Sequence, residues 1–368
     1  MRTVRRAAMA LPAVAMLLLA ISPAAARAAT WPSRRVASAP TFTAIGPLDS
    51  NVLSMSADGS ILVGDDIYGR NAFEWTPARG TRFLGAAGGQ VSVSRDGSTI
   101  VGDVFSHGHV TAAIYRSGTW RSLGGYPGSE GCPALSNAYA VADGGSSVVG
   151  LGWNDCDATA FEWTRASGIQ SLGSLDDQAS RANDVDADGS VIVGWDDATD
   201  GARRGARWVD GAESLLSPTG PFVGSAEAVT ADGSVVVGGE AGPGAVHNQA
   251  YRWTQARGPQ LLGKLPGGGV LAIASALSVT DDGKIVVGFS GAALRKAFLW
   301  AGATGMIPLQ SYLQGLGVTG LDGWHLDTAI SISADGSTIA GWGYNPDGRV
   351  QSWLVTGLPA IQGRPTVE

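Results

Sequence analysis

The residues best suited to chemistry in this sequence are histidines, tryptophans and carboxylates that fall outside its repeated segments. His107 and His109 are two positions apart in "SHGHV". On an extended segment both imidazoles would face the same side and could reach one metal ion, with Asp155 of a neighbouring loop as a third ligand. Because no longer ligand motif accompanies the pair, two solvated loop histidines are the simpler interpretation. We therefore predict no metal and no cofactor.

Loop carboxylates are the candidates for acid–base catalysis. Asp196 and Asp197 are adjacent, and adjacent residues of a strand point to opposite sides, so these two form a poor pair. Carboxylates from different loops could form a glycosidase or lyase site. The sequence contains no nucleophile elbow, phosphate-binding loop or dinucleotide fingerprint, so no catalytic residue is assigned.

Loop aromatics beside carboxylates also suit binding. Aromatic ring faces stack on the apolar faces of sugars, while carboxylates accept hydrogen bonds from sugar hydroxyls. Tryptophan and tyrosine equally anchor protein partners. A third interpretation is that these aromatics pack against the chain that carries them, since much of any protein surface is apolar.

A repeated segment must position these residues. The glycine in the turn of "VSRDGSTIVGD" (93–103) recurs at seven anchor positions: Gly59, Gly97, Gly145, Gly189, Gly233, Gly283 and Gly336. A second glycine follows five residues after every anchor. Asp-Gly supplies the positive φ that a two-residue hairpin turn needs, and the β-branched run after it is too short for a helix. In the third copy Gly144 and Gly145 replace Asp-Gly.

Each copy continues with two further strands. A Leu-Gly signal ends the fourth strand, and an aromatic marks the third: Trp75, Tyr115, Trp163, Trp208, Trp253, Trp300 and Trp353. The markers are expected to fill equivalent gaps in the core. Six fourth strands follow seven third strands, and "TFTAIGPL" (41–48) has the pattern of the missing one.

This arrangement predicts an all-β fold, a seven-bladed β-propeller over residues 41–356. Its blades are four-stranded and antiparallel, and the N-terminal strand completes the last blade, which otherwise would leave an open edge. An open β-solenoid or two small β-domains are the alternatives. A solenoid would not need the displaced N-terminal strand, so the propeller is favoured.

The combined pattern, A-x-x-V-S-x-D-G-S-x-V-V-G…A-F-x-W…G-x-x-x-L-G-x-L, resembles the bacterial extracellular repeats called HAF repeats. The resemblance covers most of the chain after residue 28. It implies the repeat architecture and little about chemistry, because members of that group generally have no assigned activity or catalytic motif that could be carried over.

Insertions gather on one face of this propeller. The first-to-second and third-to-fourth turns of a copy keep nearly constant lengths, whereas its other two connections vary. In an up-and-down blade the constant turns share one face, here the fixed face, and the varying connections share the other, the variable face. Loops on a rigid scaffold usually carry binding residues. The ligand-binding residues predicted on the variable face are Tyr68, His107, His109, Trp153, Asp155, Trp195, Asp196, His247, Trp324, His325, Trp342 and Tyr344.

The ends of the chain indicate export. Arg2, Arg5 and Arg6, the apolar run after them and the small-residue pattern at 26–28 predict a secretory signal peptide over residues 1–28. A linker (29–40) precedes the propeller and a tail (357–368) follows it. The sequence has no second long apolar run, so no membrane span is expected. The protein is therefore expected in the periplasm or outside the cell, as a monomer.

Charge and cysteine content agree with that setting. Loss of residues 1–28 removes four arginines from a chain of net charge −7 and leaves −11, which argues against nucleic acid as a partner. Cys132 and Cys156 are the only cysteines. In an oxidising compartment a disulfide is favoured over two unpaired thiols or a two-thiol zinc site. Such a bridge would join two variable-face loops beside the third blade.

These observations predict a binding module whose variable face holds an extracellular ligand, a glycan or a protein. The alternative is a hydrolase or lyase that acts on a polysaccharide with carboxylates of the variable loops. A pocket shared by the four loop tryptophans would favour sugar binding. Buried carboxylates of raised pKa near the mouth of the central channel would favour the enzyme.

Overall fold

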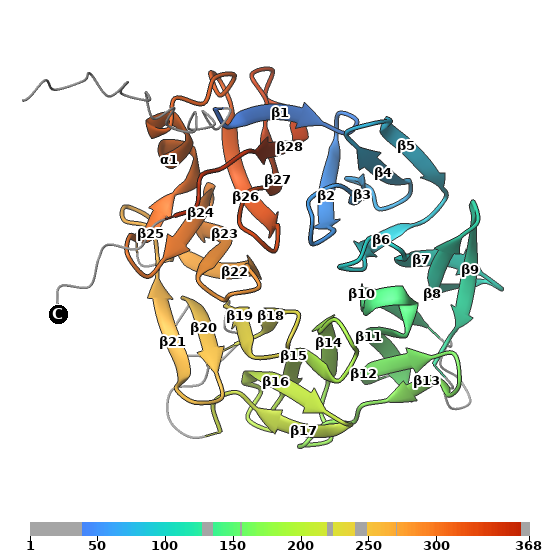
Figure 1. Cartoon of the computed structure of the whole chain (residues 1–368). Coiled ribbons are helices and arrows are strands. Elements are labelled where there is room, and N and C mark those ends of the chain that lie inside the picture. Colours follow the sequence, from blue (N-terminus) through green and yellow to red (C-terminus); the bar gives the residue numbers. More distant parts are fainter. Residues whose placement is uncertain are drawn as a thin grey trace, which may run out of the picture. The chain divides into compact units, whose positions relative to one another are not determined.

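The computed structural model describes residues 39–126, 135–154, 157–218, 224–239, 249–269 and 271–361. Seven four-stranded antiparallel sheets are arranged as blades around a common centre, so the predicted seven-bladed β-propeller is confirmed (Figure 1). The signal peptide predicted over 1–28, the bridge predicted between Cys132 and Cys156, and the tail beyond 361 lie outside the described residues. In the described part of the chain, no helix is both long and apolar enough to cross a membrane.

Each of the first four blades is formed by four consecutive strands. Blade 1 contains β2 (Ser50–Met55), β3 (Leu62–Asp66), β4 (Ala72–Thr76) and β5 (Gly80–Gly85), and blade 2 contains β6 (Gly88–Val93), β7 (Ile100–Ser106), β8 (His109–Arg116) and β9 (Thr119–Gly124). Blade 3 contains β10 (Ser136–Val141), β11 (Ser147–Asn154), β12 (Asp157–Thr164) and β13 (Gly168–Ser171), and blade 4 contains β14 (Ser180–Val185), β15 (Val191–Asp197), β16 (Arg203–Val209) and β17 (Ala212–Leu215). A short 3-10 turn, Asp143–Gly145, joins β10 to β11.

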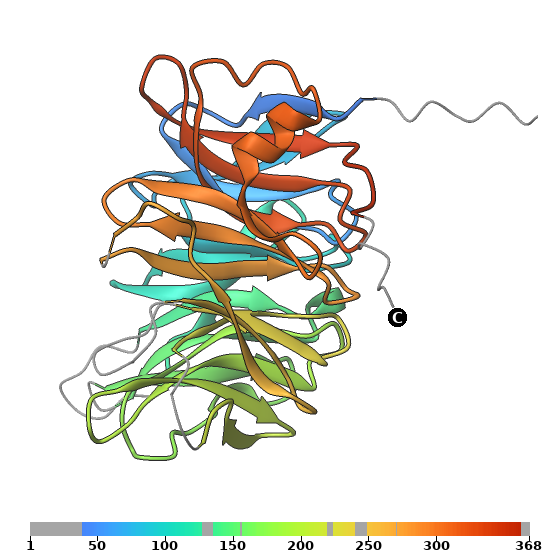
Figure 2. The same cartoon turned by 90° about the vertical axis from the view of Figure 1, so that its left-hand side faces the viewer.

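Blade 5 contains β18 (Ala226–Val229), β19 (Val235–Gly238), β20 (Ala250–Thr254) and β21 (Gly258–Gly263). Blade 6 contains β22 (Ile273–Val279), β23 (Ile285–Gly291), β24 (Arg295–Ala301) and β25 (Gly305–Pro308). Blade 7 contains β26 (His325–Ile332), β27 (Ile339–Tyr344), β28 (Val350–Thr356) and the N-terminal strand β1 (Thr41–Ile45). Strand β1 pairs antiparallel with β28. The helix α1 (Leu309–Gly315) lies in the longest connection, between blades 6 and 7. Figure 2 shows the ring from its side, with the strands running between the two faces.

Hydrophobic packing joins neighbouring blades. Each of the seven clusters in the described residues combines side chains of two adjacent blades. The third-strand marker Trp208 is fully buried among residues of blades 3 and 4. Ile45 of β1 packs with Leu354 of blade 7 and Val52 of blade 1, which places an apolar contact across the junction between the two ends of the ring.

The repeated turn is held by its own side chains. In blade 5 the Thr230 hydroxyl donates to Asp232 Oδ1 at 2.7 Å and accepts the Val235 N–H at 3.0 Å, while the Ser234 N–H donates to the same Asp232 oxygen. Gly233 has φ of +68°, which favours glycine there. The serine or threonine, the aspartate and the anchor glycine are therefore turn residues, as the repeat pattern predicts.

The second glycine of the repeats in blades 1 and 3 to 7 has a different cause, a β-bulge in the innermost strand. In blade 6 the register slips between Ala276 and Ser278, so Leu277 is the extra residue. The bulge presses the Ser275 carbonyl against Gly288, where a Cβ would lie 2.0 Å from that oxygen. Similar contacts of 1.9–2.1 Å occur at Gly64, Gly150, Gly194, Gly238 and Gly341. The glycine is thus the space that the bulge requires.

The repeated turns also form a girdle at the fixed-face end of the ring. Residues two positions before the anchors are joined by backbone hydrogen bonds between successive blades. The Ala334 N–H donates to Ala57 O at 2.8 Å, and the Ala57 N–H donates to Arg95 O at 2.8 Å. Equivalent bonds link Asp143 to Ala187 and Ala187 to Ala231. The turns therefore surround one mouth of the central channel.

Candidate functional site

The predicted binding residues of blades 1 and 2 lie at the β3–β4 and β7–β8 turns. Tyr68 is in the turn between β3 and β4 and is 68% exposed. His107 is in the turn between β7 and β8, where its Nδ1 is 2.9 Å from Ser106 Oγ, and His109 begins β8. The Arg70 guanidinium lies 4.9 Å from the centre of the Tyr68 ring.

A pocket of about 490 Å³ lies between these two blades. Phe105, 77% exposed, is the most prominent apolar side chain in its lining. The pocket is lined by Gly69, Arg70, Ala86, Ala87, Gly88, Gly89, Asp103, Val104, Phe105, Val110 and Asn137. It therefore combines an exposed aromatic ring with a guanidinium, a carboxyl group and an amide.

Two buried carboxyl groups lie near Gly89, and one of them, that of Asp103, lines this pocket. Asp103 accepts the Asn137 amide at 2.7 Å and the Ala138 N–H at 2.9 Å. Burial nevertheless raises the pKa of Asp103 to about 7. Asp65, which accepts the Gly89 N–H, also has its pKa raised to about 7, by burial first and by the charge of Asp66 second. Both groups titrate near neutral pH.

Blade 7 holds a second group of predicted residues. Trp324 packs edge-on against Phe42 at 5.1 Å between ring centres and belongs to the core between blades 6 and 7. His325 Nε2 is 2.7 Å from Arg295 O, and its ring is 6.1 Å from that of Tyr344. Trp342 is half-buried within β27. Only Tyr344 of this group is an exposed aromatic.

The predicted residues of blades 3 and 4 are tied to their surroundings. Trp195 is only 6% exposed, and the Arg203 guanidinium stacks over its ring at 3.6 Å. Asp196 is buried and accepts hydrogen bonds from the Ser174 hydroxyl at 2.7 Å and the Leu175 N–H at 2.9 Å. Trp153, in β11, is half-buried.

The four loop tryptophans thus come from three different blades: Trp153 from blade 3, Trp195 from blade 4, and Trp324 and Trp342 from blade 7. Asp155 and His247, predicted in the same set, lie outside the described residues. The pocket between blades 1 and 2 is lined by sequence neighbours of Tyr68, His107 and His109 but by none of these three residues. Within the described ranges, no group of three or more histidine, cysteine, aspartate or glutamate side chains is placed to hold a metal ion.

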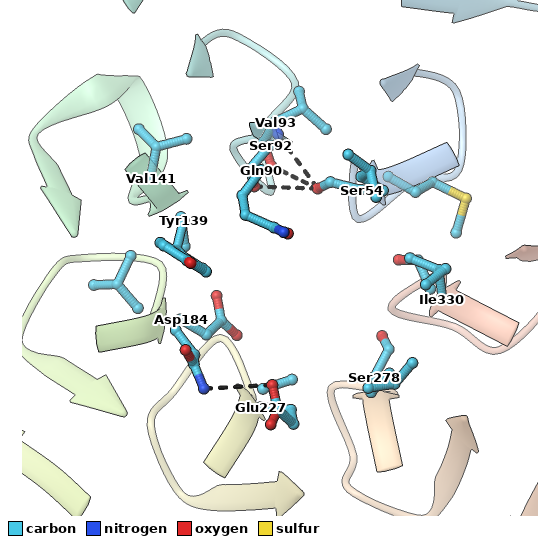
Figure 3. A pocket seen from close by; sticks show the side chains of 18 of the residues that line it. Ser54, Gln90, Ser92, Val93, Tyr139, Val141, Asp184, Glu227, Ser278 and Ile330 are labelled. Carbon is cyan, nitrogen blue, oxygen red and sulfur yellow. Dashed lines mark hydrogen bonds between the residues drawn. The ribbon is translucent and has the colours of Figure 1, made fainter. Parts of the chain in front are cut away.

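The centre of the ring holds a cavity of about 160 Å³, which the sequence pattern does not predict (Figure 3). Residues of all seven innermost strands line it. On one side Asn183 is held by the Arg181 guanidinium at 2.6 Å and donates to Glu227 Oε2 at 3.3 Å. Asp184 Oδ2 accepts the Val229 N–H at 2.9 Å, and burial raises the Asp184 pKa to about 6.

An ion pair spans the fixed-face end of this cavity. Arg95 of blade 2 pairs with Asp281 of blade 6. Because blades 2 and 6 are not neighbours in the ring, the contact must cross its centre. The repeated turns, which the sequence indicates as structural, therefore also supply two charged groups that pair at this end.

The sequence does hold a signal for the missed residues. In blades 1 and 3 to 7 a register slip of the innermost strand falls at the residue six positions before the anchor glycine. These bulge residues line the cavity: Leu53, Tyr139, Asn183, Glu227, Leu277 and Ile330. This position varies in type inside an otherwise constant segment. Asp103 and Phe105 are likewise missing from the predicted set. Asp65 and Asp103 both follow the second glycine of adjacent copies directly, a coincidence that the sequence displays.

Comparison with known proteins adds support for the fold. No protein-family model and no curated protein sequence matches the chain. An oligogalacturonate lyase in complex with manganese is 12% identical with a TM-score of 0.55, and the match covers 86% of this chain and 93% of that one. The β-propeller domain of Cps50 (Swd1) from Myceliophteria thermophila is 11% identical with a TM-score of 0.54, over 84% of this chain and 98% of that one.

A third propeller, that of the Trilobed protease from Pyrococcus furiosus, is 10% identical with a TM-score of 0.52, over 90% of this chain and 99% of that one. The chain spans 65% of the length of TolB from Acinetobacter baumannii, and at a TM-score of 0.43 that likeness carries no argument. At such identities these structures are similar to the chain in fold alone.

Proposed function

We propose that this chain is an exported, monomeric binding module that holds an extracellular glycan at its variable face, in the pocket between blades 1 and 2. The observation that carries the proposal is the exposed ring of Phe105 at the edge of a hollow that also presents Arg70 and Asp103. The Phe105 ring is 77% exposed, so a ligand that covers it would remove apolar surface from water and thereby gain binding energy.

The chemistry of the pocket matches that of a sugar ring. The face of Phe105 offers the stacking surface that the C–H face of a sugar prefers. The Arg70 guanidinium donates to hydroxyl oxygens, and the carboxyl group of Asp103 exchanges hydrogen bonds with hydroxyls. A volume of about 490 Å³ falls within the usual range of ligand pockets, which is roughly 300–1,000 Å³.

The Phe105→Ala variant is expected to lose about five- to thirtyfold in glycan affinity, because a buried aromatic contact contributes on the order of 1–2 kcal/mol to binding. A glycan array first identifies the ligand of the mature protein, and isothermal titration then measures the affinity of each variant. Phe83, 63% exposed on the outermost strand β5, provides the matched control. Equal losses in Phe83→Ala and Phe105→Ala would place the ligand elsewhere, and an array without hits would favour a protein partner.

A second candidate function rests on the two carboxyl groups beside Gly89. A general acid or base works best when its pKa lies near the working pH. Asp65 and Asp103 both have pKa values of about 7 and are within interaction range of each other. A polysaccharide hydrolase or lyase could use this pair. Release of reducing ends or unsaturated products by the wild type, abolished in Asp103→Asn, would establish turnover, whereas binding without products would leave the binding module.

A further inference from the structure

The carboxyl group in the pocket between blades 1 and 2 is largely committed to the protein itself. Asp103 is only 8% exposed. One of its oxygens accepts the Asn137 amide and the other accepts the Ala138 N–H. The Gly89 backbone covers the first oxygen so closely that a Cβ added to Gly89 would overlap it. Asp103 therefore offers a ligand only the remaining lone pairs of oxygens that already have partners.

Most of the remaining lining is apolar. Phe105 and Val110 are directly opposite each other in the hairpin of β7 and β8, so their side chains lie on the same face of it. Ala86 and Ala87 add to the apolar surface of the pocket. A sugar ring with a hydroxyl on nearly every carbon would lose hydration against this surface without gaining enough partners. The pocket therefore favours a ligand group that is mostly apolar.

A hydrogen-bond donor accompanies this apolar surface. Arg70 is exposed in the turn between β3 and β4 and belongs to the lining of the pocket. A guanidinium has several N–H donors and no acceptor. The neighbouring Asp66 carboxylate already interacts with the charge of Arg70, so a neutral acceptor suits Arg70 better than an anion. A methyl group beside a carbonyl oxygen, which is an acetyl group, matches both the apolar surface and the donor.

We propose, on the basis of the glycan-binding function proposed above, that this pocket recognises an acetyl group of the glycan. The methyl group packs against Val110 and Ala86, and the plane of the acetyl group lies on the Phe105 ring. The carbonyl oxygen accepts a hydrogen bond from Arg70. Acetyl groups occur as N-acetyl groups of amino sugars and as O-acetyl esters of polysaccharides, and the experiment separates these two sources.

A glycan array of matched pairs tests the proposal on the unchanged mature protein. One pair is N-acetylglucosamine oligosaccharides and cello-oligosaccharides of equal length, which have a hydroxyl in place of each acetamido group. The other is acetylated xylo-oligosaccharides and the same material after saponification. By isothermal titration, the bound acetylated series should exceed its unacetylated counterpart in affinity by about tenfold, since a methyl contact and a hydrogen bond are lost without the acetyl group.

The outcomes of the array separate this proposal from the proposed function. Binding of one acetylated series assigns the source as N-acetyl or O-acetyl. Binding that does not depend on the acetyl groups would overturn acetyl recognition and leave glycan binding in place. An array on which no glycan binds would overturn both.

The variant Val110→Thr places the acetyl group within the pocket. It exchanges one methyl group for a hydroxyl and keeps a β-branched side chain suited to a strand. Affinity for the acetylated series should fall about three- to fivefold, because one methyl contact is lost. Val350→Thr, at the start of the corresponding strand β28 of blade 7, is the matched control and should leave affinity unchanged. Thermal unfolding shows that both variants are folded, and unchanged affinity in folded Val110→Thr would overturn the proposal.

Discussion

Replacing Gly288 by alanine is expected to lower the free energy of unfolding by about 3 kcal/mol or more, the upper end of what overpacking costs. The added Cβ would lie 2.0 Å from the Ser275 carbonyl oxygen. Neither atom belongs to a flexible side chain, so relief requires the backbone of β22 or β23 to move. That movement would break the bulge and the strand pairing on both sides of it. Chemical denaturation followed by circular dichroism measures the loss.

Gly102 provides the matched control because it is the same repeat position in blade 2. There the nearest atom to an added Cβ belongs to the Trp120 side chain, at 3.2 Å, and no backbone atom lies closer than 3.5 Å. Gly102→Ala should therefore cost less than about 1 kcal/mol, since the indole ring has to shift by only a few tenths of an ångström. Equal losses in the two variants would show that the bulge is not the reason for the repeated glycine.

The comparison between these two glycines also shows what the sequence reveals of the fold. The spacing of anchors, second glycines and marker aromatics is enough to predict seven blades, because each is a local requirement of a turn or of packing between blades. The bulge is not visible in that spacing. It shifts the alternation of side chains by one residue within a strand, and the period of two on which strand patterns are read then fails at the bulge. For this reason the residues that line the central cavity could not be predicted from the sequence pattern.

The variable face shows a second limit. Loop position correctly predicts that Tyr68 lies at the surface. The same argument predicts an exposed Trp195, but the Trp195 ring is buried and stacks on Arg203. Sequence spacing places a residue on a face of the propeller. It does not say whether that residue's side chain turns outward or packs against the next blade, because this depends on partners such as Arg181 and Arg203 that are distant or unremarkable in the sequence.

The stability of the protein is expected to fall as the pH rises from about 4 to about 7. Asp65 and Asp103 have pKa values of about 7 in the folded state, above the ordinary aspartate value of 3.8 that applies to the unfolded chain. Between these values the folded state binds more protons than the unfolded state, so a rise in pH favours unfolding. Each carboxyl group accounts for at most about 4 kcal/mol, at roughly 1.4 kcal/mol per pKa unit. Urea denaturation at several pH values measures the slope.

The variant Asp65→Asn should remove the cost of ionising one of these buried carboxyl groups and raise the free energy of unfolding by about 2 kcal/mol at pH 8. At pH 4 the gain should be small, because the wild-type carboxyl group is then protonated in the folded state. The asparagine oxygen can still accept the Gly89 N–H. Asp232→Asn is the control, because turn hydrogen bonds lower the pKa of Asp232 and its loss should not stabilise the protein at pH 8.

The same variant relates stability to function. A chain that keeps two costly carboxyl groups beside one pocket gives up stability that a simple substitution would restore, and such losses are typical of functional sites. We therefore expect Asp65→Asn to bind or process the ligand of the variable-face pocket less well than the wild type, although it is more stable. A variant that is more stable and retains full binding and turnover would show that Asp65 serves neither function.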